Sequence, residues 1–264
     1  MDDYKYILWE RRDRVLTLKL NRPESLNAFN PGLHYEFSRA FIDAAADKES
    51  DIIVLTGAGR AFSAGGDAKD TTDPGPFEIV TAREAKLICN SMLDCDKPVI
   101  TKINGPAIGL GATVALFGDI TFMARSAIIA DPHVRVGLVA GDGAAVIWPQ
   151  LIGYARAKEY LFTGDKITAD EAYRLGLVNH VVDDAELDAA VDAFADRLAA
   201  GAQRAIRWTK LTINVGLKQL AASMLDTGIA YESVSTYSDD HKAAIAAFRE
   251  GGRPQFGRSE SGRS

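Results

Sequence analysis

Short β-branched segments alternate with segments of helical spacing along the first half of the chain, and this alternation limits the fold more than any other feature. Residues 52–56 form a continuous apolar run that is typical of a buried strand. The segment before it, residues 31–44, begins with proline and carries its apolar side chains at helical spacing. The strand pattern recurs at residues 98–103 and 120–123, with a further helical segment at 78–93. Strands that alternate with helices predict an α/β fold built on a largely parallel sheet.

The two ends of the chain depart from this pattern. Residues 4–10 and 14–20 are short apolar runs separated by charged residues, which predicts a β-hairpin. From about residue 151 the chain becomes mainly helical, with amphipathic spacing at 206–217 and 225–248. These late helices exceed what one α/β core needs.

The composition argues against several classes of protein. The 264 residues include 36 Asp and Glu against 30 Lys and Arg, and a net charge of −6 disfavours a nucleic-acid partner. The sequence has neither a secretion signal nor an apolar run long enough for a membrane span. Two cysteines, Cys89 and Cys95, are too few for a disulfide framework. A cytoplasmic location is therefore expected.

Glycine turns and histidines supply no recognisable cofactor or metal motif. Three Gly-x-Gly turns lack the third glycine of the dinucleotide fingerprint, and no phosphate-binding loop motif is present. The four histidines are scattered without the spacing of a metal-binding pair, so no metal site is expected. His34 and His241 are expected on helix surfaces.

Two loops have the character of backbone anion-binding sites. Residues 60–67 follow a predicted buried strand and contain small residues, which lets a ligand approach the backbone closely. Residues 104–112 form a turn that opens an apolar helix, whose first amides have no intrahelical partner. If the loops converge, each can donate one N–H to a carbonyl oxygen that becomes negative during a reaction. Two tight turns in a packed fold explain the same residues equally well.

Five motifs together resemble one family. The segments 21–28, 57–69, 104–119, 161–165 with 169–178, and 247–256 closely resemble the crotonase (enoyl-CoA hydratase/isomerase) superfamily. The motifs stand in the family's order over nearly the whole chain, which is far more specific than any single glycine turn.

The resemblance implies a fold and a class of substrate. The fold is an α/β spiral of ββα turns in residues 1–200, followed by a helical oligomerisation region in residues 201–264. The implied partner is an acyl-CoA thioester, as in fatty acid metabolism. The substrate itself carries the coenzyme A, so no separate cofactor is expected. The implied assembly is a homotrimer or a dimer of trimers.

The resemblance also assigns site residues. The oxyanion donors are the backbone N–H groups of Gly66 and Leu110, where the family usually has glycine at the second position. Lys69 is further implied to meet phosphate. The residues implied to line the bound coenzyme A are Ser25, Leu26, Ala28, Ala64, Asp67, Ala68 and Lys69.

The acid/base positions depart from the family pattern. A standard hydratase of this family uses two glutamates, and the corresponding residues here are Thr113 and His133. Residues 131–133, with 140–144, instead resemble 6-oxocamphor hydrolase, a branch of the family in which a histidine and an aspartate form an acid/base dyad. This similarity assigns His133 and Asp142 to proton transfer. An aspartate that accepts from one imidazole nitrogen raises the basicity of the other.

Three functions remain open at this stage. The first is an enoyl-CoA hydratase/isomerase-type enzyme that forms a thioester enolate. The second is a hydrolase that cleaves a C–C bond of a β-diketone with the His/Asp dyad, although this branch has a further histidine where the chain has Leu110. The third is a CoA-binding protein without catalytic activity.

Overall fold

A six-stranded sheet, in the order β1-β2-β3-β4-β6-β9, organises the computed structural model, which describes residues 4–67 and 79–257. Its β1 and β2 form the predicted antiparallel hairpin, and every later neighbour pairs in parallel. The strands are β1 (Ile7–Arg12), β2 (Val15–Leu20), β3 (Ile52–Gly57), β4 (Val99–Ile103), β6 (Ile120–Ala124) and β9 (His180–Val182). The predicted parallel α/β sheet is therefore confirmed.

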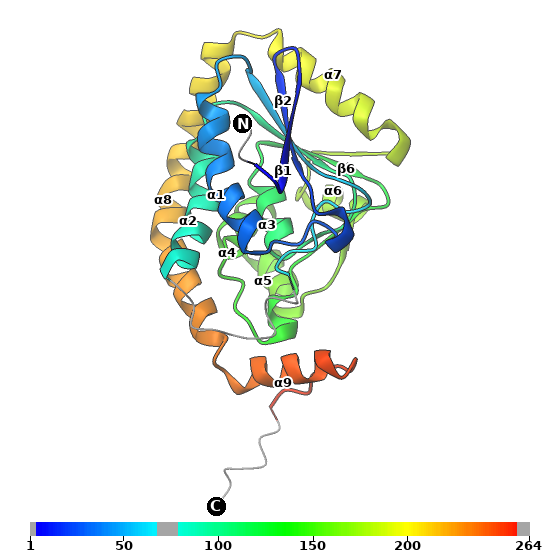
Figure 1. Ribbon diagram of the computed structural model, residues 1–264, viewed down its shortest axis with the longest axis vertical. Coiled ribbons are helices and arrows are strands. Elements are labelled where there is room, and N and C mark those ends of the chain that lie inside the picture. Colours follow the sequence, from blue (N-terminus) through cyan, green and yellow to red (C-terminus); the bar gives the residue numbers. More distant parts are fainter. Residues whose placement is uncertain (1–3, 68–78, 258–264) are drawn as a thin grey trace, which may run out of the picture.

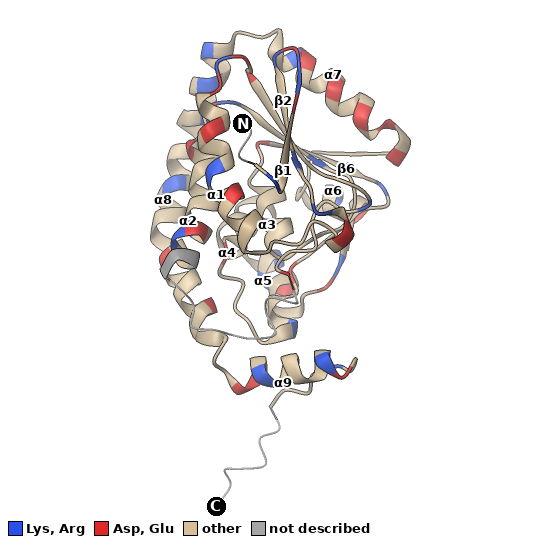
Figure 2. Cartoon of the chain, in the orientation of Figure 1, with Lys and Arg blue, Asp and Glu red and all other residues tan. Residues whose placement is uncertain are grey.

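Helices cover both flanks of this sheet. Figure 1 shows α1 (Pro31–Ala46), α2 (Ile79–Asp94) and α8 (Gln203–Ser235) side by side on one flank and α7 (Leu187–Ala199) on the other. The first of these helices begins where the side chain of Asn30 accepts a hydrogen bond from the backbone N–H of Leu33. Its apolar face is buried as its spacing predicts. Figure 2 shows acidic residues along α7 and basic residues distributed over several elements.

A second, smaller sheet has three strands. It has the order β5-β7-β8, with β5 (Ala107–Ile108), β7 (Ile128–Ala130) and β8 (Ile167–Thr168). The chain passes from β4 to β5 and into α3 (Leu110–Leu116), then from β6 to β7 and into the 3-10 helix η3 (His133–Val136). The remaining elements are η1 (Pro23–Ser25), α4 (Ala144–Ile152), α5 (Tyr154–Thr163), α6 (Ala169–Leu175) and η4 (Asp184–Glu186).

The C-terminal region differs in detail from its prediction. Instead of separate helices at 206–217 and 225–248, α8 runs for 33 residues without a break and α9 (Asp239–Arg249) follows it. Packing of α8 along α2 and α4 sustains the long helix through Gly216. The boundary at residue 200 remains a prediction. Within the described ranges, no helix combines the length and apolarity needed to cross a membrane.

The last helix folds back onto the core. It begins at Ser238, whose hydroxyl accepts a hydrogen bond from the backbone N–H of His241. The His241 ring donates from Nδ1 to the backbone oxygen of Val136 over 2.7 Å. This hydrogen bond fixes α9 against η3, at one side of the pocket described below.

Candidate active site

The two glycine-rich loops converge, as the sequence predicts. The backbone N–H of Ile108 donates to the oxygen of Ser63 over 2.9 Å, which joins the second loop to the first. Gly65 has φ +84°, and a β-carbon there would lie 2.5 Å from the oxygen of Ile108 and 3.5 Å from the nitrogen of Leu110. Only glycine permits both this backbone conformation and this close approach. The loop that carries Gly66 therefore lies directly against the first turn of α3.

The backbone N–H groups of Gly66 and Leu110 donate no hydrogen bond within the described residues. Leu110 is the first residue of α3, so its amide has no acceptor within the helix. On the other loop, Phe29 donates to the oxygen of Gly65 and accepts from the nitrogen of Asp67. In such a parallel bridge the N–H of Gly66, between these two residues, points away from Phe29. The geometry thus leaves both predicted amides available to a ligand.

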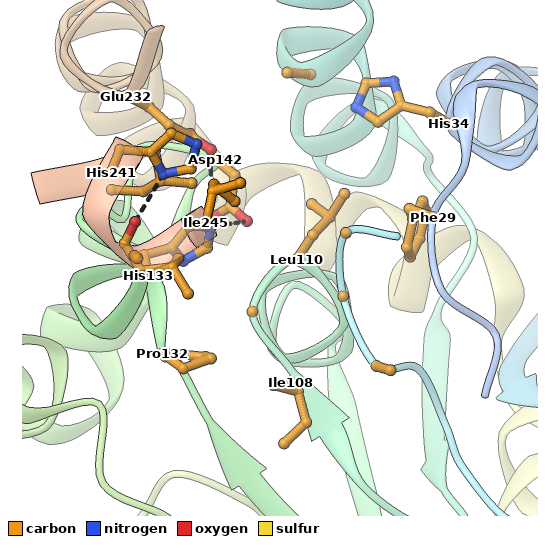
Figure 3. Close-up of a pocket in the computed structure, with 18 of the residues that line it drawn as sticks. Phe29, His34, Ile108, Leu110, Pro132, His133, Asp142, Glu232, His241 and Ile245 are labelled. Atoms are coloured by element: carbon orange, nitrogen blue, oxygen red, sulfur yellow. Dashed lines mark hydrogen bonds and ion pairs between the residues drawn. The ribbon is translucent and has the colours of Figure 1, made fainter. Parts of the chain in front are cut away.

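Both loops open on a pocket of about 350 Å³. Figure 3 shows that His133, Asp142, Glu232 and His241 lie on one side of this pocket, whereas His34 and Phe29 lie on the other. Apolar side chains provide most of the remaining lining: Ala64, Ala85, Ile108, Leu110, Pro132, Val136, Leu138, Ile229, Ala244, Ile245 and Phe248. Such a lining suits an acyl chain.

His133 and Asp142 both line this pocket, but the aspartate that orients the imidazole is a different one. Nδ1 of His133 lies 2.5 Å from Oδ1 of Asp131, two residues earlier. Asp142 lies on the opposite side of the ring, with Oδ2 3.6 Å from Nε2. The sequence leaves open whether Asp142 acts through His133 or directly. In the structure Asp131 is the aspartate that orients the ring, because the turn at Pro132 brings it onto Nδ1.

The remaining oxygen of Asp142 is held by the protein. Oδ1 accepts hydrogen bonds from the hydroxyl of Thr113, 3.0 Å away, and from the backbone N–H of Ala144. Its Oδ2 is buried and has no hydrogen-bond partner among the described residues. Thr113 thus positions Asp142.

A third carboxyl group reaches the same imidazole. Oε1 of Glu232, near the end of α8, lies 3.7 Å from Nε2 of His133. Glu232 is not among the predicted site residues, because no local motif marks it and only the path of α8 brings it to the pocket. The sequence predicts His241 and His34 on helix surfaces, but both line the pocket. His241 is buried at 1% exposure, and Nδ1 of His34 lies 3.0 Å from the carboxyl group of Glu84, within hydrogen-bond distance.

Burial and charge displace the pKa values of these groups. Burial disfavours the imidazolium of His133, but the carboxyl groups of Asp131 and Asp142 outweigh this effect and hold its pKa well above the usual value. Burial also raises the pKa of Asp142, against the opposing charge of His133. Burial raises the pKa of Glu232 to about 8. These shifts favour the protonated forms of His133 and Glu232.

Asp131, His133 and Asp142 are also close enough to be considered as metal ligands, with their ligand atoms within 4.8 Å of one another. However, the two aspartates meet different nitrogens of one imidazole ring. One ion cannot bind both nitrogens of a single ring, so this arrangement favours proton transfer over metal binding.

The predicted coenzyme A contacts come together only in part. The loop with Ser25, Leu26 and Ala28 is hydrogen-bonded to the other loop through the nitrogen of Ala64 and the oxygen of Leu26, at 2.9 Å. Asp67 pairs with Arg22, 3.0 Å from its guanidinium. Ala68 and Lys69 lie outside the described residues. Contact of any of these residues with coenzyme A remains a prediction.

The fold and the site together define an enzyme with two loop amides and acid/base residues around one apolar pocket. A family model described as enoyl-CoA hydratase/isomerase matches residues 10–259. The chain belongs to this family, the crotonase superfamily.

Individual relatives match over nearly the full length. The chain is 33% identical to the 1,2-epoxyphenylacetyl-CoA isomerase of Escherichia coli over 257 residues, 96% of this chain and 98% of that one. It is 32% identical to the short-chain-enoyl-CoA hydratase of Clostridium acetobutylicum, over 92% of this chain and 94% of the relative. An enoyl-CoA hydratase/isomerase structure from Mycobacterium paratuberculosis superimposes with a TM-score of 0.87 at 37% identity, covering 91% and 97% of the two chains.

Proposed function

We propose that this protein acts on an acyl-CoA thioester and stabilises the enolate formed from it. The observation that carries the proposal is the pair of backbone amides of Gly66 and Leu110, which have no acceptor among the described residues and lie on loops that touch at the wall of an apolar pocket. Two such donors stabilise a thioester oxygen that gains negative charge. The names of the relatives, one an isomerase and one a hydratase, agree with this chemistry.

The acid/base residues complete the proposed mechanism. Oδ2 of Asp142 is buried and free to accept the proton from the α-carbon of the thioester. The charged imidazole of His133, 3.6 Å away, stabilises the Asp142 carboxylate and exchanges protons with it. Asp131 holds the imidazole through Nδ1, so that Nε2 faces the pocket.

Exchange of the α-proton with solvent tests the enolate directly. A saturated acyl-CoA such as hexanoyl-CoA, incubated with the protein in D₂O, is expected to gain deuterium at the α-carbon, as followed by mass spectrometry. A panel of 2-enoyl-CoA, 3-enoyl-CoA and cyclic β-diketone substrates then identifies the net reaction. Binding of CoA thioesters without any exchange or conversion would favour a binding protein over an enzyme.

We also propose that the chain assembles into a homotrimer or a dimer of trimers. Large apolar side chains on α8 and α9 are exposed in the single chain, as an interface requires. They include Trp208 (62% exposed), Ile213 (71%), Val234 (68%) and Phe248 (61%). Light scattering at micromolar concentration is expected to give the mass of a trimer or a hexamer, and a monomer would contradict the proposal.

A further inference from the structure

Nε2 of His133 lies between two carboxyl groups that come from distant parts of the chain. Oδ2 of Asp142 is 3.6 Å from it and Oε1 of Glu232 is 3.7 Å from it. Both carboxyl groups line the pocket that the Gly66 and Leu110 amides open on. The described part of the site therefore has two carboxyl groups that share one imidazole nitrogen.

Direct packing fixes Glu232 relative to Asp142. A β-carbon at Gly141 would lie 2.9 Å from Cβ of Glu232 and 2.1 Å from the backbone oxygen of Gly228. The turn that carries Asp142 thus lies against α8, and only glycine fits at position 141. Among the described residues, His133 is the only ion-pair partner of Glu232. The side chain of Glu232 is only 21% exposed, and placing a carboxyl group in such surroundings is costly. Ionisable groups in such surroundings concentrate at functional sites.

We propose that Glu232 is a further catalytic residue, the proton donor in the migration of a double bond along an acyl-CoA chain. This inference rests on the proposed function, since it uses the same enolate. The reaction concerned is the conversion of a 3-enoyl-CoA thioester to its conjugated 2-enoyl isomer.

The proton transfers balance without water or a co-reactant. Asp142 accepts the proton of the α-carbon, and the electron pair of the broken C–H bond moves onto the thioester oxygen held by Gly66 and Leu110. The neutral carboxyl group of Glu232 then donates its proton to the γ-carbon, the electron pair returns from the oxygen, and Glu232 becomes a carboxylate. Finally, Nε2–H of His133 protonates Glu232 and takes the proton left on Asp142, which restores the starting state.

The surroundings favour this proton shift over the addition of water. The hydroxyl proton of Thr113 is donated to Asp142, so Thr113 has no further proton to donate to a water. Most of the pocket lining is apolar. A reaction that consumes no water suits such a pocket better than hydration does.

The test compares two reactions in two variants. Conversion of 3-hexenoyl-CoA to 2-hexenoyl-CoA needs both proton transfers, whereas α-deuteration of hexanoyl-CoA needs only the first. Glu232→Gln keeps the shape and burial of the side chain but removes its acidic proton. It is expected to lower kcat for conversion by ~10²-fold or more with KM nearly unchanged, while α-deuteration proceeds as in the wild type. The control Asp226→Asn removes a surface carboxylate of the same helix, paired with Lys86 at 2.7 Å, and is expected to leave both reactions unchanged.

Each other outcome has a distinct meaning. If Glu232→Gln converts 3-hexenoyl-CoA at the wild-type rate and still catalyses α-deuteration, the role of Glu232 is overturned and the proposed function stands. Hydration of 2-hexenoyl-CoA by the wild type without conversion of the 3-enoyl isomer would overturn the assigned reaction. Absence of α-deuteration in the wild type would overturn the proposed function and this inference with it. Thermal unfolding of each variant verifies that the comparison is made on folded protein.

Discussion

Nδ1 of His133 lies 2.5 Å from Oδ1 of Asp131, and this contact fixes which nitrogen of the ring faces the pocket. Asp131 is almost fully buried, at 1% exposure, and the backbone N–H of His133 also donates to the same oxygen. The ring therefore cannot rotate without breaking a buried hydrogen bond. Nε2 is left between Asp142 and Glu232, where protons are exchanged in the proposed mechanism.

Asp131→Asn is expected to lower the pKa of His133. The amide keeps the shape of the carboxyl group but loses the negative charge that favours the imidazolium. A histidine titration followed by NMR should therefore show the transition at lower pH, and kcat should fall by ~10-fold or more because the relay is less well oriented. The control Asp165→Asn removes an exposed carboxylate paired with Arg135. An unchanged His133 pKa in Asp131→Asn would contradict the assignment of the orienting residue.

His133→Ala and Asp142→Ala are each expected to lower turnover by ~10²-fold or more, because general acid/base residues contribute about that much. Affinity for CoA thioesters should hardly change, since neither residue lies among the predicted coenzyme A contacts. Steady-state kinetics and calorimetric binding separate the two effects. Unchanged turnover in both variants would remove these residues from the mechanism.

The pKa of Glu232 predicts how stability depends on pH. Burial raises this pKa to about 8, above the value of about 4.3 expected in the unfolded chain. The folded state therefore binds more protons between these values, and the contribution of the neutral carboxyl group is complete below pH 4 and lost as pH rises through 8. Glu232→Gln has no such proton to lose.

Urea denaturation at several pH values measures this difference. The free energy of unfolding of the wild type, relative to that of Glu232→Gln, should fall from pH 5 to about pH 8 and level off above it. His133, Asp131 and Asp142 face Glu232 in both proteins, and the difference reports the titration of Glu232 together with its effect on these neighbours. Parallel curves for the two proteins would show that Glu232 is ionised at neutral pH.

Local patterns predicted the fold because each depends on near neighbours in the chain. The face of α1 with Leu33 and Phe37 is buried as its spacing predicts, and the loops with Gly66 and Leu110 meet because they follow adjacent parallel strands. His133, the residue assigned to proton transfer from the family resemblance, lines the pocket.

The remaining features depend on tertiary structure and have no local signal. Asp131 stands two residues before His133 in the sequence, but nothing in the sequence decides whether Asp131 or Asp142 reaches Nδ1 of the ring. Glu232 and His241 reach the pocket through the long course of α8 and the return of α9 onto η3. A helical pattern identifies which residues share a face, but not which distant element that face meets.

Gly65→Ala is expected to separate the two loops that carry the oxyanion donors. The substitution places a β-carbon 2.5 Å from the oxygen of Ile108 and requires φ +84° of a residue that disfavours it. The backbone must shift, and the amides of Gly66 and Leu110 move apart. Loss of one such donor costs ~10²-fold in kcat. The unfavourable backbone conformation lowers stability by ~1 kcal/mol or more.

A second glycine separates this geometric effect from a general effect of the added methyl group. Gly216 lies within α8, and a β-carbon there meets no atom within 4 Å. Gly216→Ala is therefore expected to raise stability by up to ~1 kcal/mol, because alanine favours the helix, and to leave turnover unchanged. Kinetics and thermal unfolding of both variants check the pair. Wild-type turnover in Gly65→Ala would mean that the spacing of the two amides does not limit the reaction, and the oxyanion assignment would fail.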